Sequence, residues 1–195
     1  MRYAVLFLAL YITQASSFSQ KFCNFQAAHY LHTTNETVDS RADTFDVLSY
    51  EINAAFLDYQ TQKAIDANTI IETVLLEKSN TMRLDLLSLD VWQVQVNSVD
   101  VSFTYQSPSL VLDVSHINKG DTFQVYVKYS GKPKRDPQWG GFYFTGEYAF
   151  NLGVGFASDP HNFGRVWFPC FDNFTDRAEY FTHITVDTGY RAYAN

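Results

Sequence analysis

The stretch Gly164–Tyr180 reads GRVWFPCFDNFTDRAEY and says more about the fold than any other part of the chain. Trp167 and Phe168 carry large apolar surfaces that favour burial. Pro169 lacks a backbone N–H, so it ends a strand or lies at a sheet edge. The adjacent Cys170 is more typical of a small buried hydrophobic residue than of a nucleophile. This stretch therefore predicts a kinked, aromatic and largely buried segment at the edge of a strand.

From Thr44 onward, the sequence alternates with the period of two that is typical of β-strands. Short runs of this kind are separated by turn-forming residues, for example Ser107-Pro108 and Asn118–Asp121. The pattern predicts an all-β fold, either an antiparallel β-sandwich or a saddle-shaped double sheet. The predicted strands are Phe45–Phe56, Ile65–Leu76, Met82–Leu86, Val91–Val96, Val101–Tyr105, Leu110–Val114 and Thr122–Tyr129.

Residues 1–19 have the features of a secretory signal peptide. Arg2 gives a basic start, Tyr3–Ile12 is dominated by apolar residues, and Ser17 and Ser19 allow cleavage before Gln20. The apolar run is shorter than the about 20 residues that cross a bilayer. We therefore expect an exported protein, periplasmic or secreted, with no membrane span after signal cleavage. A buried N-terminal helix is the alternative interpretation of this segment.

Residues 20–43 are predicted to form a short helix and a loop before the β domain, which spans 44–195. The helix covers Phe22–His32, where the apolar face is ragged, and Thr33–Ala42 is polar and loop-like. Export would permit a disulfide between Cys23 and Cys170. Two cysteines are too few to define a disulfide framework, so their pairing stays open.

The composition excludes some classes of partner and of chemistry. Net charge is −7 and charged residues make up 18% of the chain, so we expect no nucleic-acid partner. The histidines lack the spacing of a His-Glu-x-x-His zinc helix. We therefore predict no catalytic and no metal-binding residue within these 195 residues. The five histidines are His29, His32, His116, His161 and His183.

The opening stretch resembles a segment of the zinc aminopeptidases related to aminopeptidase N and leukotriene hydrolase. Their N-terminal domain contains Arg-x-x-Phe-Pro-Cys-x-Asp followed by a basic residue, Ala and an aromatic residue. Further landmarks of that domain occur in the same order over Thr44–Asn195. The matching residues are Asp46–Tyr50, Leu84–Leu86, Val127–Gly131, Gly141–Tyr143, Arg165, Phe168–Cys170, Asp172, Arg177, Ala178 and Tyr180.

This resemblance implies the N-terminal, non-catalytic domain of an exported zinc metallo-aminopeptidase, which removes N-terminal residues from peptides. In such enzymes the domain caps the active-site cleft, and zinc is held by a separate catalytic domain. Peptide N-termini and the chain's own catalytic domain are the implied partners. The family has further strands after the point corresponding to Asn195. The resemblance thus implies a fragment of a longer enzyme, inactive alone and cut before the last strands of its first domain.

One stretch is implied to approach the substrate. In the family, the loop before the Phe-Pro-Cys segment carries a Gln or Glu that contacts the first residue of the peptide. The corresponding stretch here, Tyr148–Asn162, has neither residue at that position, and Asn151 is the nearest polar candidate. The structural alternative is an aromatic, Gly-rich hairpin that only packs on the catalytic domain.

Two other functions fit parts of the sequence. A non-enzymatic relative could use the same sandwich as a binding or scaffold domain after loss of the zinc motif. A secreted adhesin or sugar-binding sandwich suits the aromatic content of 17%. The adhesin interpretation leaves Phe168-Pro169-Cys170 unexplained, so we favour the aminopeptidase domain.

Overall fold

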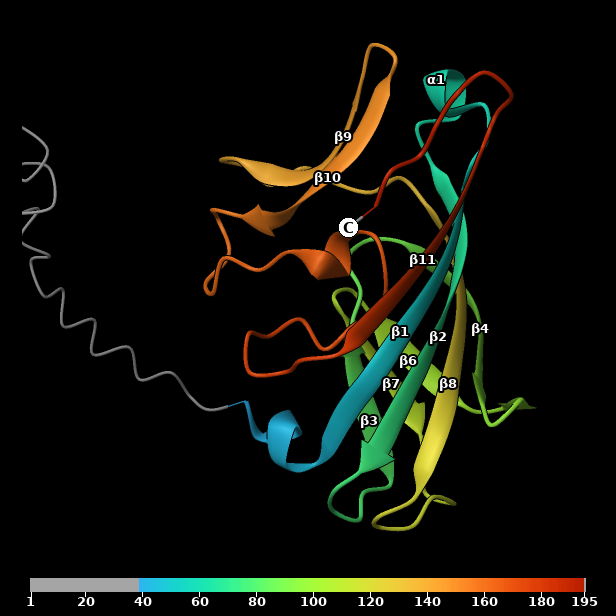
Figure 1. Cartoon of the computed structure of the whole chain (residues 1–195). Coiled ribbons are helices and arrows are strands. Elements are labelled where there is room, and N and C mark those ends of the chain that lie inside the picture. Colours follow the sequence, from blue (N-terminus) through green and yellow to red (C-terminus); the bar gives the residue numbers. More distant parts are fainter. Residues whose placement is uncertain (1–38, 195) are drawn as a thin grey trace, which may run out of the picture. The chain divides into compact units, whose positions relative to one another are not determined.

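Strands dominate residues 39–194, the part of the chain that this computed structural model describes (Figure 1). The larger of the two main sheets has six strands in the order β11-β1-β2-β8-β4-β5. All neighbours in it are antiparallel except β11 and β1, which run parallel. Its strands are β1 (Phe45–Phe56), β2 (Ile65–Leu75), β4 (Asp90–Val96), β5 (Val99–Asp100), β8 (Thr122–Gly131) and β11 (Glu179–Val186).

A second sheet has three antiparallel strands in the order β3-β7-β6 (Figure 1). Every second residue of β3 and β7 is buried, as the period-two pattern requires. Met82, Leu84, Leu110 and Leu112 form this apolar face and belong to the same core as the large sheet. The strands are β3 (Thr81–Asp85), β6 (Phe103–Gln106) and β7 (Ser109–Asp113).

The core between the sheets is made of alternate residues of β1, β2, β4 and β8. Along β2, every second residue from Ile65 to Leu75 is buried, including Thr69 and Thr73, and the residues between them are more exposed. The buried hydroxyl groups of Thr69 and Tyr129 satisfy each other at 3.0 Å. This arrangement confirms the predicted all-β, largely antiparallel fold with several sheets.

Four short elements complete the described fold. Two of them, the helix α1 (Tyr59–Gln62) and the 3₁₀ turn η2 (Ser40–Asp43), flank β1 in the sequence. The prediction of a loop up to Ala42 was therefore wrong at its end, because Asp39 caps a 3₁₀ turn by accepting the Arg41 N–H. A two-stranded hairpin and a second 3₁₀ turn, described below, follow β8.

The structure departs from the predicted strands at two further places. Of the predicted strand Val101–Tyr105, only Phe103–Tyr105 lie in a strand, β6, whereas β5 precedes Val101 and belongs to the other sheet. In β4, an irregularity between Val91 and Gln93 interrupts the alternation and leaves Trp92 64% exposed. The Trp92 indole N–H instead donates to the Ser130 hydroxyl at 2.7 Å.

The predicted signal peptide, the helix Phe22–His32 and Cys23 lie outside the described residues. Cys170 is buried and its thiol is free. Within residues 39–194, neither α1 nor any other helix is long and apolar enough to cross a membrane.

Candidate functional site

The stretch expected near substrate, Tyr148–Asn162, begins with β10 (Tyr148–Gly155). This strand forms a β-hairpin with β9 (Gly140–Thr145), and the two make a separate two-stranded sheet (Figure 1). Two glycines begin it for a steric reason. A Cβ on Gly140 would lie 2.0 Å from the Val154 carbonyl oxygen, and one on Gly141 would lie 2.6 Å from that of Lys134. Both also have a positive φ, which disfavours other residues.

Asp136 organises the base of this hairpin. Its carboxylate accepts the backbone N–H groups of Gln138, Trp139 and Ala157 at 2.9–3.1 Å. Burial opposes ionisation of this carboxyl, but the N–H donors outweigh burial and hold the pKa of Asp136 below its usual value. Asp136 was not among the residues predicted from the sequence. The sequence did contain a signal for this turn. An Asp followed by Pro and, further on, by Gly residues is typical of a turn in which the Asp side chain bonds to nearby backbone groups.

The two faces of the hairpin differ in what they contact. Phe142 on β9 is buried and stacks on Phe56 of β1, with ring centroids 5.6 Å apart. On the opposite face, Tyr143 and Phe150 are cross-strand neighbours and stack at 5.1 Å. The Arg135 guanidinium covers the Tyr143 ring at 4.6 Å. One face thus attaches the hairpin to β1, and the other is an exposed aromatic platform.

Asn151 lies in β10 directly opposite Phe142, so it belongs to the attached face. It therefore sits in a strand and not in a flexible loop. Its side chain is half-buried, and its Oδ1 atom accepts no hydrogen bond from any of the residues 39–194. A buried unpaired acceptor typically costs about 1–3 kcal/mol. The amide oxygen is thus a buried hydrogen-bond acceptor without a donor among the described residues.

Exposed aromatic side chains gather around the hairpin. Trp139 and Phe156 are half-exposed and pack on each other with ring centroids 5.0 Å apart. Tyr148 is 71% exposed and Phe150 is 40% exposed. Exposed aromatic side chains in such numbers are typical of interaction surfaces. We call Trp139, Tyr148, Phe150 and Phe156 the aromatic face.

The Phe-Pro-Cys segment holds the hairpin and β11 against the two main sheets. It follows the 3₁₀ turn η3 (Gly164–Val166). Cys170 forms an antiparallel bridge with Asp85 at the end of β3, through backbone hydrogen bonds of 2.7 and 3.0 Å. The next residue, Phe171, donates its N–H to the buried Tyr50 hydroxyl at 3.0 Å. The predicted buried segment at a strand edge is confirmed, and burial raises the pKa of the Cys170 thiol well above its usual value.

Arg165 and Asp172, two of the residues that match the family pattern, close this segment into a loop. The guanidinium donates to the Asp172 carboxylate at 2.6 Å, and the same carboxylate accepts the N–H groups of Gly164 and Arg165. Asn162 donates its side-chain amide to the Asp172 carbonyl oxygen. Because the Asp172 side chain is only 6% exposed, loss of Arg165 would leave a nearly buried charge unpaired.

Asp176 ends the segment shortly before β11, in a less favourable environment. Burial and the nearby Asp46 carboxylate raise the pKa of Asp176 to about 6, although the Val47 N–H and the Tyr50 hydroxyl bond to it. The side chain is half-buried. Ionisation of Asp176 is therefore less favourable than that of an Asp in water.

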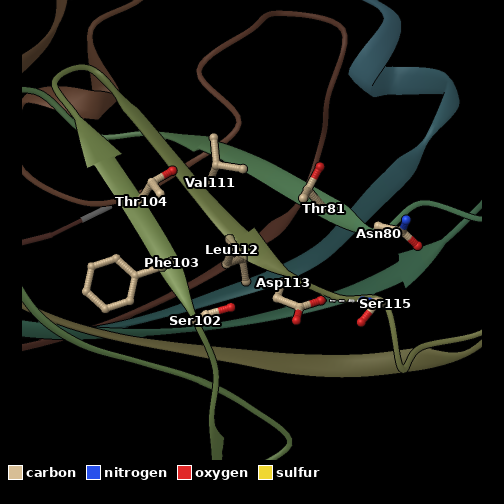
Figure 2. A pocket seen from close by; sticks show the side chains of 9 residues that line it. All are labelled: Asn80, Thr81, Ser102, Phe103, Thr104, Val111, Leu112, Asp113 and Ser115. Carbon is tan, nitrogen blue, oxygen red and sulfur yellow. Dashed lines mark hydrogen bonds between the residues drawn. The ribbon is translucent and has the colours of Figure 1, made fainter.

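An open depression of about 460 Å³ lies on the three-stranded sheet, away from the hairpin (Figure 2). Asp113 there accepts the Ser115 N–H at 2.8 Å, which lowers the pKa of Asp113. Its lining offers hydroxyl groups and one acid but no histidine, cysteine or second acid, so it holds no catalytic pair. The lining residues are Asn80, Thr81, Ser102, Phe103, Thr104, Val111, Leu112, Asp113 and Ser115.

Among residues 39–194, no group of three or more His, Cys, Asp or Glu side chains could hold a metal ion. The described residues therefore do not fit a zinc centre. His183 is 61% exposed on β11 and lies 3.6 Å from Glu51. His161 contacts the Ser158 carbonyl oxygen and the ring of Phe156, so its contacts are local.

Solved structures with a similar fold show which class of protein this architecture occurs in. An M1 zinc metallopeptidase from Deinococcus radiodurans matches with a TM-score of 0.64 and 22% identity, over 73% of this chain and 33% of that chain. Leukotriene A4 hydrolase from Saccharomyces cerevisiae matches with a TM-score of 0.55 and 20% identity, over 74% of this chain and 24% of that chain. The chain has the fold of one part of each of these two enzymes.

The resemblance to the aminopeptidase family is thus confirmed at the level of the fold. This chain spans a third or less of the length of these two enzymes. No family model matches the sequence. No curated protein matches it either.

We predict that Phe168 is structural. It is buried and packs edge-on against Tyr50, with ring centroids 5.6 Å apart. Phe168→Ala should lower the free energy of unfolding by about 3–5 kcal/mol. The matched control is Phe181→Ala, since Phe181 is 51% exposed and its loss should cost less than about 0.5 kcal/mol. Urea unfolding of both variants measures this, and equal losses would contradict it.

We also predict a stability change that depends on Asp176. Between pH 3.8, the usual pKa of the carboxyl group, and about pH 6, the Asp176 carboxyl group is protonated in the folded state and ionised in the unfolded chain. This group's contribution to stability therefore falls as pH rises through that window. Asp176→Asn should raise the melting temperature relative to wild type, by on the order of 2 °C at pH 7 and by less at pH 4. A difference that does not change with pH would show that Asp176 titrates normally.

Proposed function

We propose that this chain is the N-terminal, non-catalytic domain of an exported zinc metallo-aminopeptidase. In the longer protein it caps one side of the active-site cleft, and a separate catalytic domain holds zinc. The observation that carries the proposal is the fold match to M1 zinc metallopeptidases, of which this chain covers about a third. The order of the sequence landmarks over Thr44–Asn195 supports it independently.

The aromatic face supplies the surface for a catalytic domain. Trp139, Tyr148, Phe150 and Phe156 would be costly to leave in water. The hairpin that carries them is held firmly, since Phe142 contacts both Phe56 and Trp167, 5.6 and 6.5 Å away between centroids. A rigid apolar surface of this type suits a permanent partner, and we propose the catalytic domain of the same polypeptide as that partner.

Asn151 supplies the proposed contact with substrate. The Deinococcus radiodurans enzyme has been solved with a Tyr-Ser-Ala substrate, a short peptide with a free N-terminal residue. An α-ammonium group carries N–H donors, and the unpaired Oδ1 of Asn151 is an acceptor. In the longer protein Asn151 would therefore orient the peptide's first residue, with catalysis performed by groups outside this chain.

The first test compares two polypeptides. The 195-residue chain should hydrolyse no aminoacyl amide and bind no stoichiometric zinc, because its described residues offer no zinc site. The same chain, extended by the coding sequence that follows Asn195, should hydrolyse aminoacyl amides and lose that activity with a chelator. An extended protein that folds but neither binds zinc nor cleaves peptides would favour the non-enzymatic scaffold. Chelator-sensitive hydrolysis by the short chain after repurification would also refute the proposal.

A second test separates the role of Asn151 from a packing role. Asn151→Ala removes an unpaired buried oxygen, so the melting temperature of the 195-residue chain should stay the same or rise slightly. In the extended enzyme the same variant should raise KM for aminoacyl amides about tenfold, the value of one lost hydrogen bond of about 1.4 kcal/mol. Thr145→Ala, at the exposed end of β9, is the matched control and should leave KM unchanged. An unchanged substrate profile for Asn151→Ala would reduce the hairpin to a packing element.

A further inference from the structure

The loop before β11 contains the tripeptide Asn173-Phe174-Thr175. Asn-x-Ser/Thr, with any residue but Pro in the middle, is the acceptor pattern for N-linked glycosylation in secreted proteins. The sequence holds this pattern twice, the other copy being Asn35-Glu36-Thr37, which lies outside the described residues. The pattern is short and recurs by chance, so its structural setting decides whether it matters.

The structure presents Asn173 in a suitable conformation. Its Oδ1 accepts the Thr175 N–H at 3.0 Å, and its own N–H donates to the Phe171 carbonyl oxygen at 2.9 Å. These bonds form a tight turn in which Asn173 is half-buried and Phe174 and Thr175 are exposed. The side-chain nitrogen Nδ2 donates to none of the residues described here. In Asn162, by contrast, this nitrogen donates to the Asp172 carbonyl oxygen and is not available.

The surroundings of Asn173 also suit a sugar. Phe174 is 65% exposed in a turn where nothing in the described part of the chain covers it. A glycan on Asn173 would shield this ring and make the loop more soluble. Aromatic rings in contact with sugars are a common arrangement because the C–H faces of a sugar are apolar.

The position of the loop is compatible with the proposed domain interface. Glu179, the first residue of β11, pairs with Ser49, and Val186, the last, pairs with Phe56. Phe56 contacts the hairpin through Phe142, so the hairpin lies at the far end of β11 from Asn173. Seven residue steps of about 3.3 Å separate the two ends by roughly 23 Å. A glycan on Asn173 would therefore leave the aromatic face free.

We infer that Asn173 is an N-glycosylation site. The bond formed joins Nδ2 of Asn173 to the anomeric carbon of the first sugar, and the amide loses one proton. The bond broken joins that carbon to a lipid diphosphate, the donor of the oligosaccharide, and the lipid diphosphate leaves. This inference rests on the export part of the proposed function, because the donor and its transferase act only in a secretory compartment.

The test is expression of the whole chain, with its own leader, in eukaryotic cells that glycosylate secreted proteins. The secreted protein should lose mass on treatment with an enzyme that removes N-linked glycans, and Asn173 should become Asp at the released position. Asn173→Gln and Thr175→Ala should each remove one glycan. Thr175→Ser keeps the acceptor pattern and should retain it. Thr175→Ala keeps the backbone N–H that bonds to Asn173, so its loss of the glycan would reflect the hydroxyl and not the turn.

Secreted protein without a glycan on Asn173 would overturn the inference. So would failure of the native leader to deliver the chain, since the natural protein would then never meet the transferase. To recognise this second outcome, the same chain is also expressed with a foreign leader. Secretion with the foreign leader but not with the native leader would show that the native leader fails. Neither result bears on peptide hydrolysis by the extended enzyme, which is measured separately.

Discussion

The backbone bridge between Asp85 and Cys170 is the contact on which the rest of the fold depends. It joins a segment far along the chain to the end of β3, and it does so in the interior, where unpaired backbone groups are costly. Tyr50 adds a hydrogen bond to the next residue from the opposite sheet. A single segment thus contacts both main sheets, so neither can shift without breaking it.

Two consequences follow for the elements on either side of this bridge. Before it, Trp167 packs near Phe142, which fixes the hairpin and its aromatic face. After the bridge, the chain enters β11, which runs parallel to β1. Parallel neighbours need a long connection, and residues 57–178 provide one. The Phe-Pro-Cys segment therefore has a structural role, because it positions the hairpin and β11.

Charge is distributed unevenly around this segment. Arg41 bonds to Asp85 at 2.8 Å and lies over the Phe171 ring at 4.5 Å, while Arg165 pairs with Asp172. Each of these acids has a cation within bonding distance. Asp176 has instead a neighbouring acid, and the pKa of its carboxyl is raised. Ion pairs thus lie where the segment is anchored, and the carboxyl group with a raised pKa lies where the segment leads into β11.

The sequence by itself determined the strands, the core and the nature of the Phe-Pro-Cys segment. Alternation with a period of two is a local property, so residues such as Ile71 and Val94 could be assigned to the core in advance. Motif order likewise indicated the family fold. The candidate site was less predictable: Asn151 was identified by position in the chain, whereas Asp136 was missed.

Only the tertiary structure decided how these elements meet. The parallel pairing of β11 with β1 and the contact of Phe142 with Phe56 join residues far apart in the sequence. The strands β5 and β6 are neighbours in the chain but belong to different sheets. No local pattern encodes the partner of a strand edge. The same holds for Asn151, since cross-strand register with Phe142 decides which face of the hairpin it occupies. Local alternation sets which residues are buried, and long-range pairing sets what they are buried against.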